Sequence, residues 1–404
     1  MPKKISDRRK ALAIGSVAHA IQDGLGAATY VLLPILAQTF GFGYAQVGIF
    51  RGAMSLVQGL LEMSSGILSE RIGTGRSLVF GLILAGLGFA SIAGFDQANL
   101  LLICLLVVGM GSAFQHAPAS ALVSTAFETG GQRGALGLYN SSGDVGKLVF
   151  AGGFSLAIGT GINWQQVALS YGLVAIIAAF AIGLMLPTLP LSRAPSASST
   201  KNQRKGFHDP SNWGVIDRRS FATLLIVISL DSMVQAGVLV FVAFAMISKG
   251  LPLFVATMAA VVVLIGGILG KAGCGYLSQW LGVRRAFILT QLATVAGLLL
   301  VVVTPSWVAL GILLPLGVVS QGSSSITYGL IPDLIQAERL ARGYALMYSL
   351  TSFAAALGPY SFGIIADQFG ISAAFLAMAI LTLISAIPMY LVRAGNQFED
   401  QTVA

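Results

Sequence analysis

The sequence predicts an all-α membrane protein in which twelve transmembrane helices form two pseudo-symmetric bundles of six. Three observations lead to this fold class: a scarcity of charge, apolar stretches of spanning length, and an internal repeat. The 404 residues are 56% hydrophobic and only 9% charged, whereas soluble domains carry about 25% charged residues. Because so few charges cannot cover a surface that faces water, we exclude a soluble protein.

Twelve apolar stretches are long enough to span the hydrocarbon core, which takes about 20 residues of helix. Backbone polar groups in hydrocarbon must be bonded within the protein, so spans form either helices or a closed barrel. A barrel strand needs only about 10 residues, and these stretches are therefore predicted to be helices. They cover residues 11–38, 44–69, 77–95, 99–127, 134–160, 165–187, 219–248, 252–280, 285–304, 307–332, 343–366 and 371–393.

The first stretch follows a basic segment, MPKKISDRRK, in the manner of a signal peptide. It runs from Ala11 to Gln38 and contains Asp23, so it is too long and too polar for the apolar region of such a peptide. We therefore expect a retained first helix. The two cysteines, Cys104 and Cys274, both fall within predicted helices, and no disulfide framework is expected.

The distribution of basic residues predicts the orientation. Placing alternate connections on one side of the membrane gathers nineteen Lys and Arg residues there, against Lys249 alone on the other side. Because cytoplasmic connections carry the excess of Lys and Arg, we expect a bacterial inner membrane protein with both termini in the cytoplasm. The connection 189–218, rich in Ser, Pro and basic residues, reads as a cytoplasmic linker. It separates an N-terminal six-helix bundle, residues 1–188, from a C-terminal one, residues 219–404.

An internal repeat relates the two halves at a spacing of about 209 residues. Gly66 in GILSERIGTGR corresponds to Gly275 in GYLSQWLGVRR, and Asp23 nearly corresponds to Asp231. Paired six-helix repeats place a ligand near the bilayer midplane between them and expose it to either side in turn. The repeat therefore predicts a secondary transporter that works by alternating access.

The segment GILSERIGTGR lies between the second and third predicted helices. It resembles the loop signature of the major facilitator superfamily, with Glu70 in place of the usual Asp. The signature recurs in altered form as GYLSQWLGVRR and as GIIADQFG, and the resemblance covers the whole chain. It implies the major facilitator fold and a cytoplasmic gate formed by Gly66, Glu70, Arg71, Gly73 and Arg76.

Within that superfamily, AHAIQDGLGAATYVLLPIL is similar to the first helix of the fosmidomycin-resistance branch, in which a His and an Asp lie four residues apart. His19 and Asp23 fit this pattern. The fourth helix contains GMGSAFQHAPAS, which differs from the branch's His-Pro-Glu because Ala117 separates His116 from Pro118. The fourth helix has no arginine and the fifth lacks the Gly-Pro antiporter signature, so the direction of transport stays open at this point.

Nine ionisable residues fall in the interiors of predicted spans, away from the span ends. A charge at the bilayer centre costs about 2.5 to 3.5 kcal/mol, so such residues usually face a cavity or a partner. None of them lies in the third, sixth, ninth or twelfth helix, which are peripheral in facilitator folds. The nine are His19, Asp23, Arg51, Glu62, His116, Asp144, Lys147, Asp231 and Lys271.

Proton coupling is predicted for the acidic members of this set together with one imidazole. His19 and Asp23 are one helical turn apart on the same face and can form a hydrogen bond, and an imidazole can exchange protons near neutral pH. The alternative is a static hydrogen bond that packs the first helix. Glu62, Asp144 and Asp231 are the further coupling candidates.

Substrate binding is predicted for the cations. Arg51 presents a planar fork that suits a carboxylate or phosphonate; the alternative is a salt bridge to an acid on a neighbouring helix. Lys147 follows Asp144 by three residues, so the alternative for it is an ion pair within one helix. The remaining substrate-binding candidates are His116, Gln115, Asn140, Gln235 and Lys271.

The sequence thus predicts a proton-coupled secondary transporter that moves a small organic anion, phosphonate- or carboxylate-like, or a drug, with export favoured. An uptake symporter for a carboxylate is the alternative, and a membrane enzyme or sensor on a degenerate transporter fold is an alternative of another class. We expect no enzymatic activity, cofactor, metal site or nucleic-acid partner. The expected partners are protons, lipid and the small molecule, and the expected state is a monomer.

Overall fold

The computed structural model describes residues 5–127, 131–189, 214–336 and 340–392. Within these ranges the chain is almost entirely helical, which confirms the all-α prediction. Each of the twelve predicted spans corresponds to a helical segment of the described chain. In the first half these are α1 (Ile5–Phe40), α2 (Tyr44–Ile72), α3 (Thr74–Ser91) with η1 (Ile92–Gly94), α4 (Ala98–Ala113), α5 (His116–Ala126), α6 (Gln132–Gly159) and α7 (Trp164–Met185) with η2 (Leu186–Thr188). In the second half they are α8 (Arg218–Ser248), α9 (Leu253–Leu281), α10 (Val283–Val303), α11 (Ser306–Tyr328), α12 (Ile331–Leu334), α13 (Leu340–Phe369) and α14 (Ile371–Ala386) with η7 (Pro388–Leu391).

Ten helical segments in the described ranges are long and apolar enough to cross a membrane. The other two predicted spans are α2 and α6, of 29 and 28 residues. At 1.5 Å per residue both are about 40 Å long, more than the roughly 30 Å of hydrocarbon. They are less apolar because they carry four of the nine predicted intramembrane charges.

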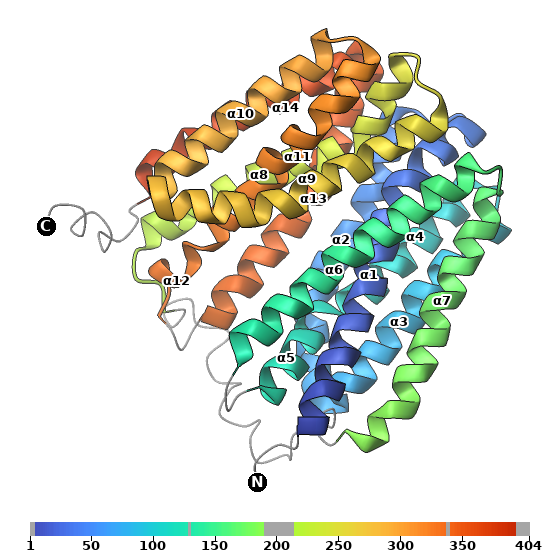
Figure 1. The fold of residues 1–404 in the computed structure, drawn as a ribbon, viewed down its shortest axis with the longest axis vertical. Coiled ribbons are helices and arrows are strands. Elements are labelled where there is room, and N and C mark those ends of the chain that lie inside the picture. Colours follow the sequence, from blue (N-terminus) through green and yellow to red (C-terminus); the bar gives the residue numbers. More distant parts are fainter. Residues whose placement is uncertain (1–4, 128–130, 190–213, 337–339, 393–404) are drawn as a thin grey trace, which may run out of the picture. The chain divides into compact units, whose positions relative to one another are not determined.

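The chain divides into two compact units: residues Met1–Phe42 with Phe50–Asn202, and Gly43–Ile49 with Gln203–Ala404. Most of the predicted linker 189–218, from residue 190 to 213, lies outside the described residues. In the first unit α1 packs on α6 and α3 on α7; in the second, the corresponding helices α8 and α13, and α10 and α14, pack on each other (Figure 1). Each unit therefore buries its helices in pairs of the same kind.

Small residues permit these helices to approach closely. On α6, Gly146 lies against the backbone of Ala20 on α1, and on α9, Gly270 lies against the backbone of Val318 on α11. A side chain at either glycine would collide with the backbone of the neighbouring helix. Helices in a membrane associate largely through close van der Waals packing at small residues, because the hydrophobic effect does not drive them together within lipid.

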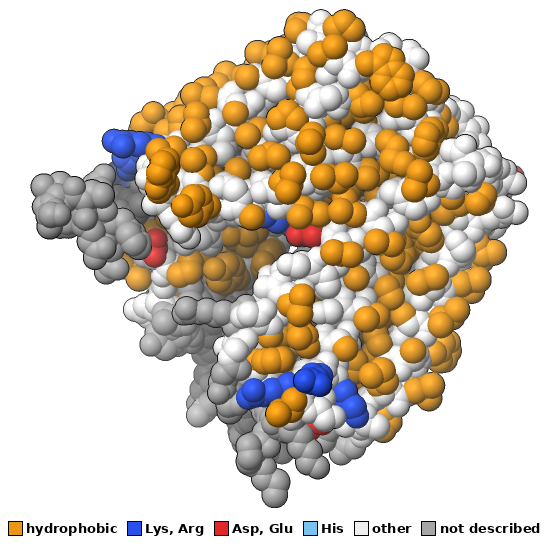
Figure 2. Space-filling view, viewed as in Figure 1, with side chains coloured by type: hydrophobic (Ala, Val, Ile, Leu, Met, Phe, Trp, Pro, Cys, Tyr) orange, Lys and Arg blue, Asp and Glu red, His pale blue; other side chains and the backbone are white. Residues whose placement is uncertain are grey.

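The outward faces of the helices are apolar. On α7, Ile177, Phe180 and Leu184 are 66%, 64% and 81% exposed. Figure 2 shows hydrophobic side chains spread over the visible face, with few charged ones among them. A lipid-facing surface accounts for this exposure, because soluble monomeric proteins rarely expose such large apolar areas to water.

The three copies of the loop signature end in the same backbone turn. Gly73, Gly282 and Gly370 have φ angles of 95°, 77° and 86°, a region that side chains rarely occupy. Each glycine directly precedes the next helix, and Gly282 lies 209 residues after Gly73. The repeat read from the sequence is therefore present in the backbone.

Two predicted spans are not continuous helices: a turn separates α11 from α12 near the end of the span 307–332, and the span 99–127 is broken near its middle. The structure ends α4 at Ala113 and begins α5 at His116, with a turn at Phe114 and Gln115. Pro118 explains the break, because it has no N–H to donate to the carbonyl of Phe114 four residues earlier. At the end of α4, the carbonyl of Ala113 accepts a hydrogen bond from the Ser65 hydroxyl. The break places His116 at the start of a new helix.

Candidate functional site

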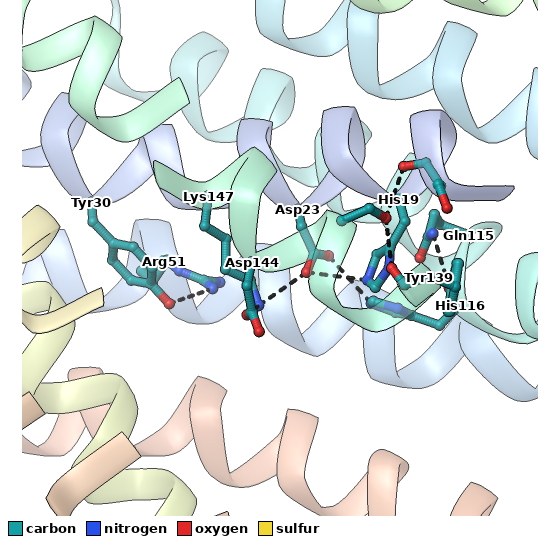
Figure 3. A network of polar contacts seen from close by, with 11 residues as sticks. His19, Asp23, Tyr30, Arg51, Gln115, His116, Tyr139, Asp144 and Lys147 are labelled. Atoms are coloured by element: carbon teal, nitrogen blue, oxygen red, sulfur yellow. Dashed lines mark hydrogen bonds and ion pairs between the residues drawn. The ribbon is translucent and has the colours of Figure 1, made fainter. Parts of the chain in front are cut away.

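The centre of the polar network in the first unit is the Asp23 carboxylate on α1 (Figure 3). The Lys147 ammonium lies 3.0 Å from Oδ2, and Nε2 of His19 lies 3.3 Å from the same oxygen. Nε2 of His116 lies 3.9 Å from Oδ1. The network thus joins α1, α5 and α6, and it brings together four of the predicted site residues.

The His19 ring is held in one orientation. Its Nδ1 lies 2.9 Å from the backbone carbonyl of Tyr139, and its plane stacks on the Tyr139 ring with centroids 4.3 Å apart. Because a carbonyl oxygen only accepts hydrogen bonds, Nδ1 carries the hydrogen. In a neutral ring Nε2 then presents its lone pair to the Asp23 carboxylate. Two lone pairs at 3.3 Å repel unless a proton or another cation lies between them.

Gly143 on α6 makes room for this pair. A Cβ at this position would lie 2.6 Å from Nε2 of His19 and 2.9 Å from Oδ2 of Asp23. Both distances are shorter than a van der Waals contact, so any side chain would push the pair apart. The glycine-rich run GDVG therefore sets the geometry of the site as well as the packing of α6 on α1.

Lys147 is compensated by two carboxylates. Besides the contact with Asp23, its Nζ lies 3.2 Å from Oδ1 of Asp144, so the predicted ion pair within one helix is present. The Lys147 side chain is 30% exposed, and those of Asp23 and Asp144 are 12% and 15% exposed. Two carboxylates beside one ammonium group leave Lys147 no excess positive charge.

Arg51 on α2 differs from Lys147 because its partners in the described part of the chain are neutral groups. One guanidinium nitrogen donates to the Ser55 hydroxyl at 2.6 Å and another to the Tyr30 hydroxyl at 2.9 Å. The guanidinium also lies over the Tyr30 ring, 4.9 Å from its centre. Within the described residues no carboxylate lies close enough to form an ion pair with Arg51, so the salt bridge considered from the sequence is not found there. The buried Nε has no hydrogen-bond partner in that part of the chain either.

Three other predicted residues of the first unit are Gln115, which lies beside the Asp23 network, and Asn140 and Glu62, which do not contact it in the described chain. Gln115 is buried and donates to the Tyr139 hydroxyl at 3.2 Å. Asn140 is exposed and joins none of the contacts among the described residues. Glu62 is partly buried, and no hydrogen bond or ion pair to its carboxylate is found in the described ranges. Sequence reasoning missed Tyr30 and Tyr139, which have no charge to draw attention to them.

The second unit holds a separate network around Asp231 on α8. Its carboxylate is 4% exposed and accepts three hydrogen bonds from neutral donors. Gln235 and Ser323 each donate to Oδ2 at 2.7 Å, and Gln291 donates to Oδ1 at 3.0 Å. Gln291 lies on α10, the ninth span, which was expected to be peripheral and without site residues. Its polarity within an otherwise apolar segment was the signal that sequence reasoning passed over.

The near correspondence of Asp23 with Asp231 does not extend to their surroundings. The spacing of 209 residues maps Asp231 onto residue 22, and Gln22 is also buried, donating to the Ser112 hydroxyl at 2.9 Å. One residue along a helix rotates a side chain by about 100°. Asp231 therefore occupies the face of Gln22 and meets α10 and α11, whereas Asp23 meets α5 and α6.

The remaining predicted residues lie on other segments of the described chain. Lys271 is exposed on α9. Of the predicted gate, Gly66 and Arg71 lie near the end of α2, Gly73 forms the turn, and Arg76 is exposed on α3. The side chain of Glu70 lies outside the described residues.

Comparison with known proteins assigns the chain to a family. The model of the Major Facilitator Superfamily matches residues 12–289 and 224–399. A probable 4-methylmuconolactone transporter of Cupriavidus pinatubonensis is 33% identical over 31% of this chain and 28% of its own length. The multidrug efflux protein YfmO of Bacillus subtilis is 30% identical over 39% of each chain. These alignments therefore span only about a third of the curated relatives' length.

Solved structures share the fold over nearly the whole chain. A bacterial homolog of the human lysosomal transporter Spinster, in an inward-facing and unoccupied conformation, aligns with a TM-score of 0.77 at 16% identity, covering 96% of this chain and 97% of its own. A variant of the nucleoside transporter NupG aligns at 0.76 and 13% identity, covering 95% and 99%. At such identities the likeness concerns the fold alone. The family match over most of the sequence, the helical repeat and this shared fold agree, and the chain belongs to the Major Facilitator Superfamily.

Proposed function

We propose that this transporter exports a small organic anion from a bacterial cell in exchange for protons, by alternating access in the inner membrane. The observation that carries the proposal is the environment of Arg51, a membrane-embedded cation whose hydrogen-bond partners among the described residues are the neutral hydroxyls of Ser55 and Tyr30. A charge at this depth is costly without a partner. A bound carboxylate or phosphonate supplies that partner during the transport cycle.

The N–H groups of Arg51 that do not contact Ser55 or Tyr30 favour an anion, such as a carboxylate or phosphonate, that presents two oxygens side by side. Its guanidinium has five N–H groups, and the contacts to Ser55 and Tyr30 use two of them. Bidentate pairing with a carboxylate or phosphonate is the arrangement in which arginine binds most strongly. The similarity to the fosmidomycin-resistance branch favours the same classes of anion.

Coupling is assigned to Asp23 with His19. Protonation of Asp23 removes its charge and breaks the contact with Lys147, which then keeps only Asp144. The proton thereby changes the net charge of the site and the partners of Lys147. Asp231 has no such partner to release among the described residues, and we assign it to the packing of the second unit.

Export is favoured because one curated relative is named a multidrug efflux protein. The excess of basic residues on one side supports the orientation with both termini in the cytoplasm. The gate role of Gly66, Glu70, Arg71, Gly73 and Arg76 is retained as part of the same proposal, on the basis of the loop signature.

The test uses purified protein in vesicles of defined orientation. Thermal-shift screening against carboxylates, phosphonates, organic cations and neutral drugs first identifies a ligand. Vesicles preloaded with that ligand are then given an inward or outward pH gradient. Opposite fluxes of proton and anion support exchange, fluxes in the same direction support the uptake symporter, and stabilisation only by cations or neutral drugs refutes the anion.

A further inference from the structure

We propose that His19, Asp23 and His116 form a binding site for a divalent transition-metal ion of the Zn²⁺ class, and that Lys147 competes with the metal for Asp23. The proposal does not depend on the identity of the transported anion. The sequence predicted no metal site, since these ligands follow no spacing motif. They converge where the chain turns between α4 and α5, directly before His116.

The distances suit a tetrahedral metal. Ligand atoms of the three side chains all lie within 4.8 Å of one another. Bonds of about 2.0 to 2.1 Å at tetrahedral angles place two ligand atoms roughly 3.3 Å apart. The pair between His19 and Asp23 is at 3.3 Å, and the pair between His116 and Asp23 is at 3.9 Å. Closing around an ion therefore needs a small movement of His116, whose side chain is 36% exposed.

The His19 ring already has the outer hydrogen bond that metal-binding histidines use. Such histidines donate their second ring nitrogen to a carbonyl or carboxylate, which fixes the ring and directs the other nitrogen at the metal. Here Nδ1 donates to the Tyr139 carbonyl at 2.9 Å, and the lone pair of Nε2 points at the Asp23 carboxylate. A metal ion bound by both Nε2 of His19 and the Asp23 carboxylate removes the repulsion between their lone pairs.

Lys147 occupies the position of a cation at this site. Its ammonium lies 3.0 Å from the Asp23 oxygen that also faces His19. A metal bound to Asp23 displaces the ammonium, which keeps a carboxylate partner in Asp144 at 3.2 Å. Lys147 thus weakens metal binding without being left unpaired, and its removal strengthens binding.

The ligand set selects the class of metal. Two imidazoles and one carboxylate suit Zn²⁺, Co²⁺ and Ni²⁺, whereas Mg²⁺ and Ca²⁺ prefer oxygen ligands. Three protein ligands leave a fourth position open. Since His116 is the most exposed of the three, that position is open to water or a small anion on its side.

The experiment titrates Co²⁺ into purified full-length protein carrying an affinity tag without histidine. We expect a saturable visible d–d absorption with one ion per chain, abolished by Zn²⁺ and unaffected by Mg²⁺. His116→Ala and Asp23→Asn are each expected to weaken Co²⁺ binding by at least about tenfold. Losing even a group that only hydrogen-bonds to a metal ligand lowers metal affinity by about ten- to a hundred-fold. Size-exclusion profiles and melting curves identify any variant that fails to fold.

Two further variants separate this site from adventitious binding. The third histidine of the chain, His208, lies outside the described residues, and His208→Ala should leave the titration unchanged. Lys147→Met should tighten Co²⁺ binding by about tenfold or more, a change opposite in sign to that from loss of a ligand. Absorption that survives His116→Ala, that disappears in His208→Ala, or that is unchanged or weaker in Lys147→Met overturns the proposal.

Discussion

Replacing Arg51 by glutamine is expected to weaken binding of the transported anion by about ten- to a hundred-fold. A charge-assisted hydrogen bond contributes about 1.5 to 3 kcal/mol in a partly buried site, and each 1.4 kcal/mol corresponds to about tenfold in affinity. The partners of Arg51 in the described chain are the neutral hydroxyls of Ser55 and Tyr30. The substitution therefore leaves no described carboxylate unpaired, and the loss should appear in binding rather than in folding.

The variant Arg51→Lys separates charge from geometry. It keeps the positive charge but loses the planar fork, so an anion bound by two parallel hydrogen bonds should still lose affinity. Arg285, exposed on α10, provides the matched control: Arg285→Gln removes one positive charge and should leave affinity unchanged. Affinity is measured by ligand-dependent thermal shift and by the concentration dependence of vesicle transport.

Retention of full affinity in both Arg51 variants would refute the reasoning. Arg51 would then act only through its contacts with Ser55 and Tyr30. The case for an anionic substrate would also fall, because Lys147 is already compensated by Asp23 and Asp144.

Four further predictions follow from the same contacts. Asp23→Asn keeps the shape of the carboxyl but cannot exchange a proton, so anion flux should lose its dependence on the pH gradient while binding persists; unchanged pH-gradient dependence would rule out the coupling role. Gly143→Ala should disturb the His19–Asp23 pair, since its Cβ would lie 2.6 Å from Nε2 of His19, and should lower transport, whereas Gly137→Ala on the same helix meets open space and should not. Asp231→Ala should lower thermal stability, because each buried donor left unpaired costs about 1 to 3 kcal/mol; an unchanged melting temperature would contradict this role. Glu70→Ala should increase cysteine accessibility on the cytoplasmic side by weakening the gate, and accessibility equal to that of the parent would show that Glu70 is not part of a gate.

Local contacts of the site could be predicted from the sequence because helical geometry fixes them. His19 and Asp23 are four residues apart, Asp144 and Lys147 three, and both pairs lie within 3.3 Å of each other, as the helical period requires. The connection between the second and third helices was likewise marked by the loop signature. In each case the partners lie within one turn of the chain, so no knowledge of neighbouring helices is needed.

Contacts between helices could not be predicted in this way. That Lys147 and His116 both reach Asp23 depends on the break after α4 and on the close packing of α6 on α1, which Gly143 and Gly146 permit. The absence of a described acid beside Arg51 likewise depends on which faces the neighbouring helices present.

The sequence by itself determined the all-α class, the twelve spans, the repeat and the set of residues that carry charge into the membrane. Hydrophobic length and period determine these features, because hydrocarbon permits only internally bonded helices of spanning length. Only the tertiary structure decided which of those charges meet. Asp23 and Asp231 look equivalent in sequence, yet a shift of one residue turns a side chain by about 100°. That rotation places Asp23 among cations and imidazoles and Asp231 among neutral amides and a hydroxyl.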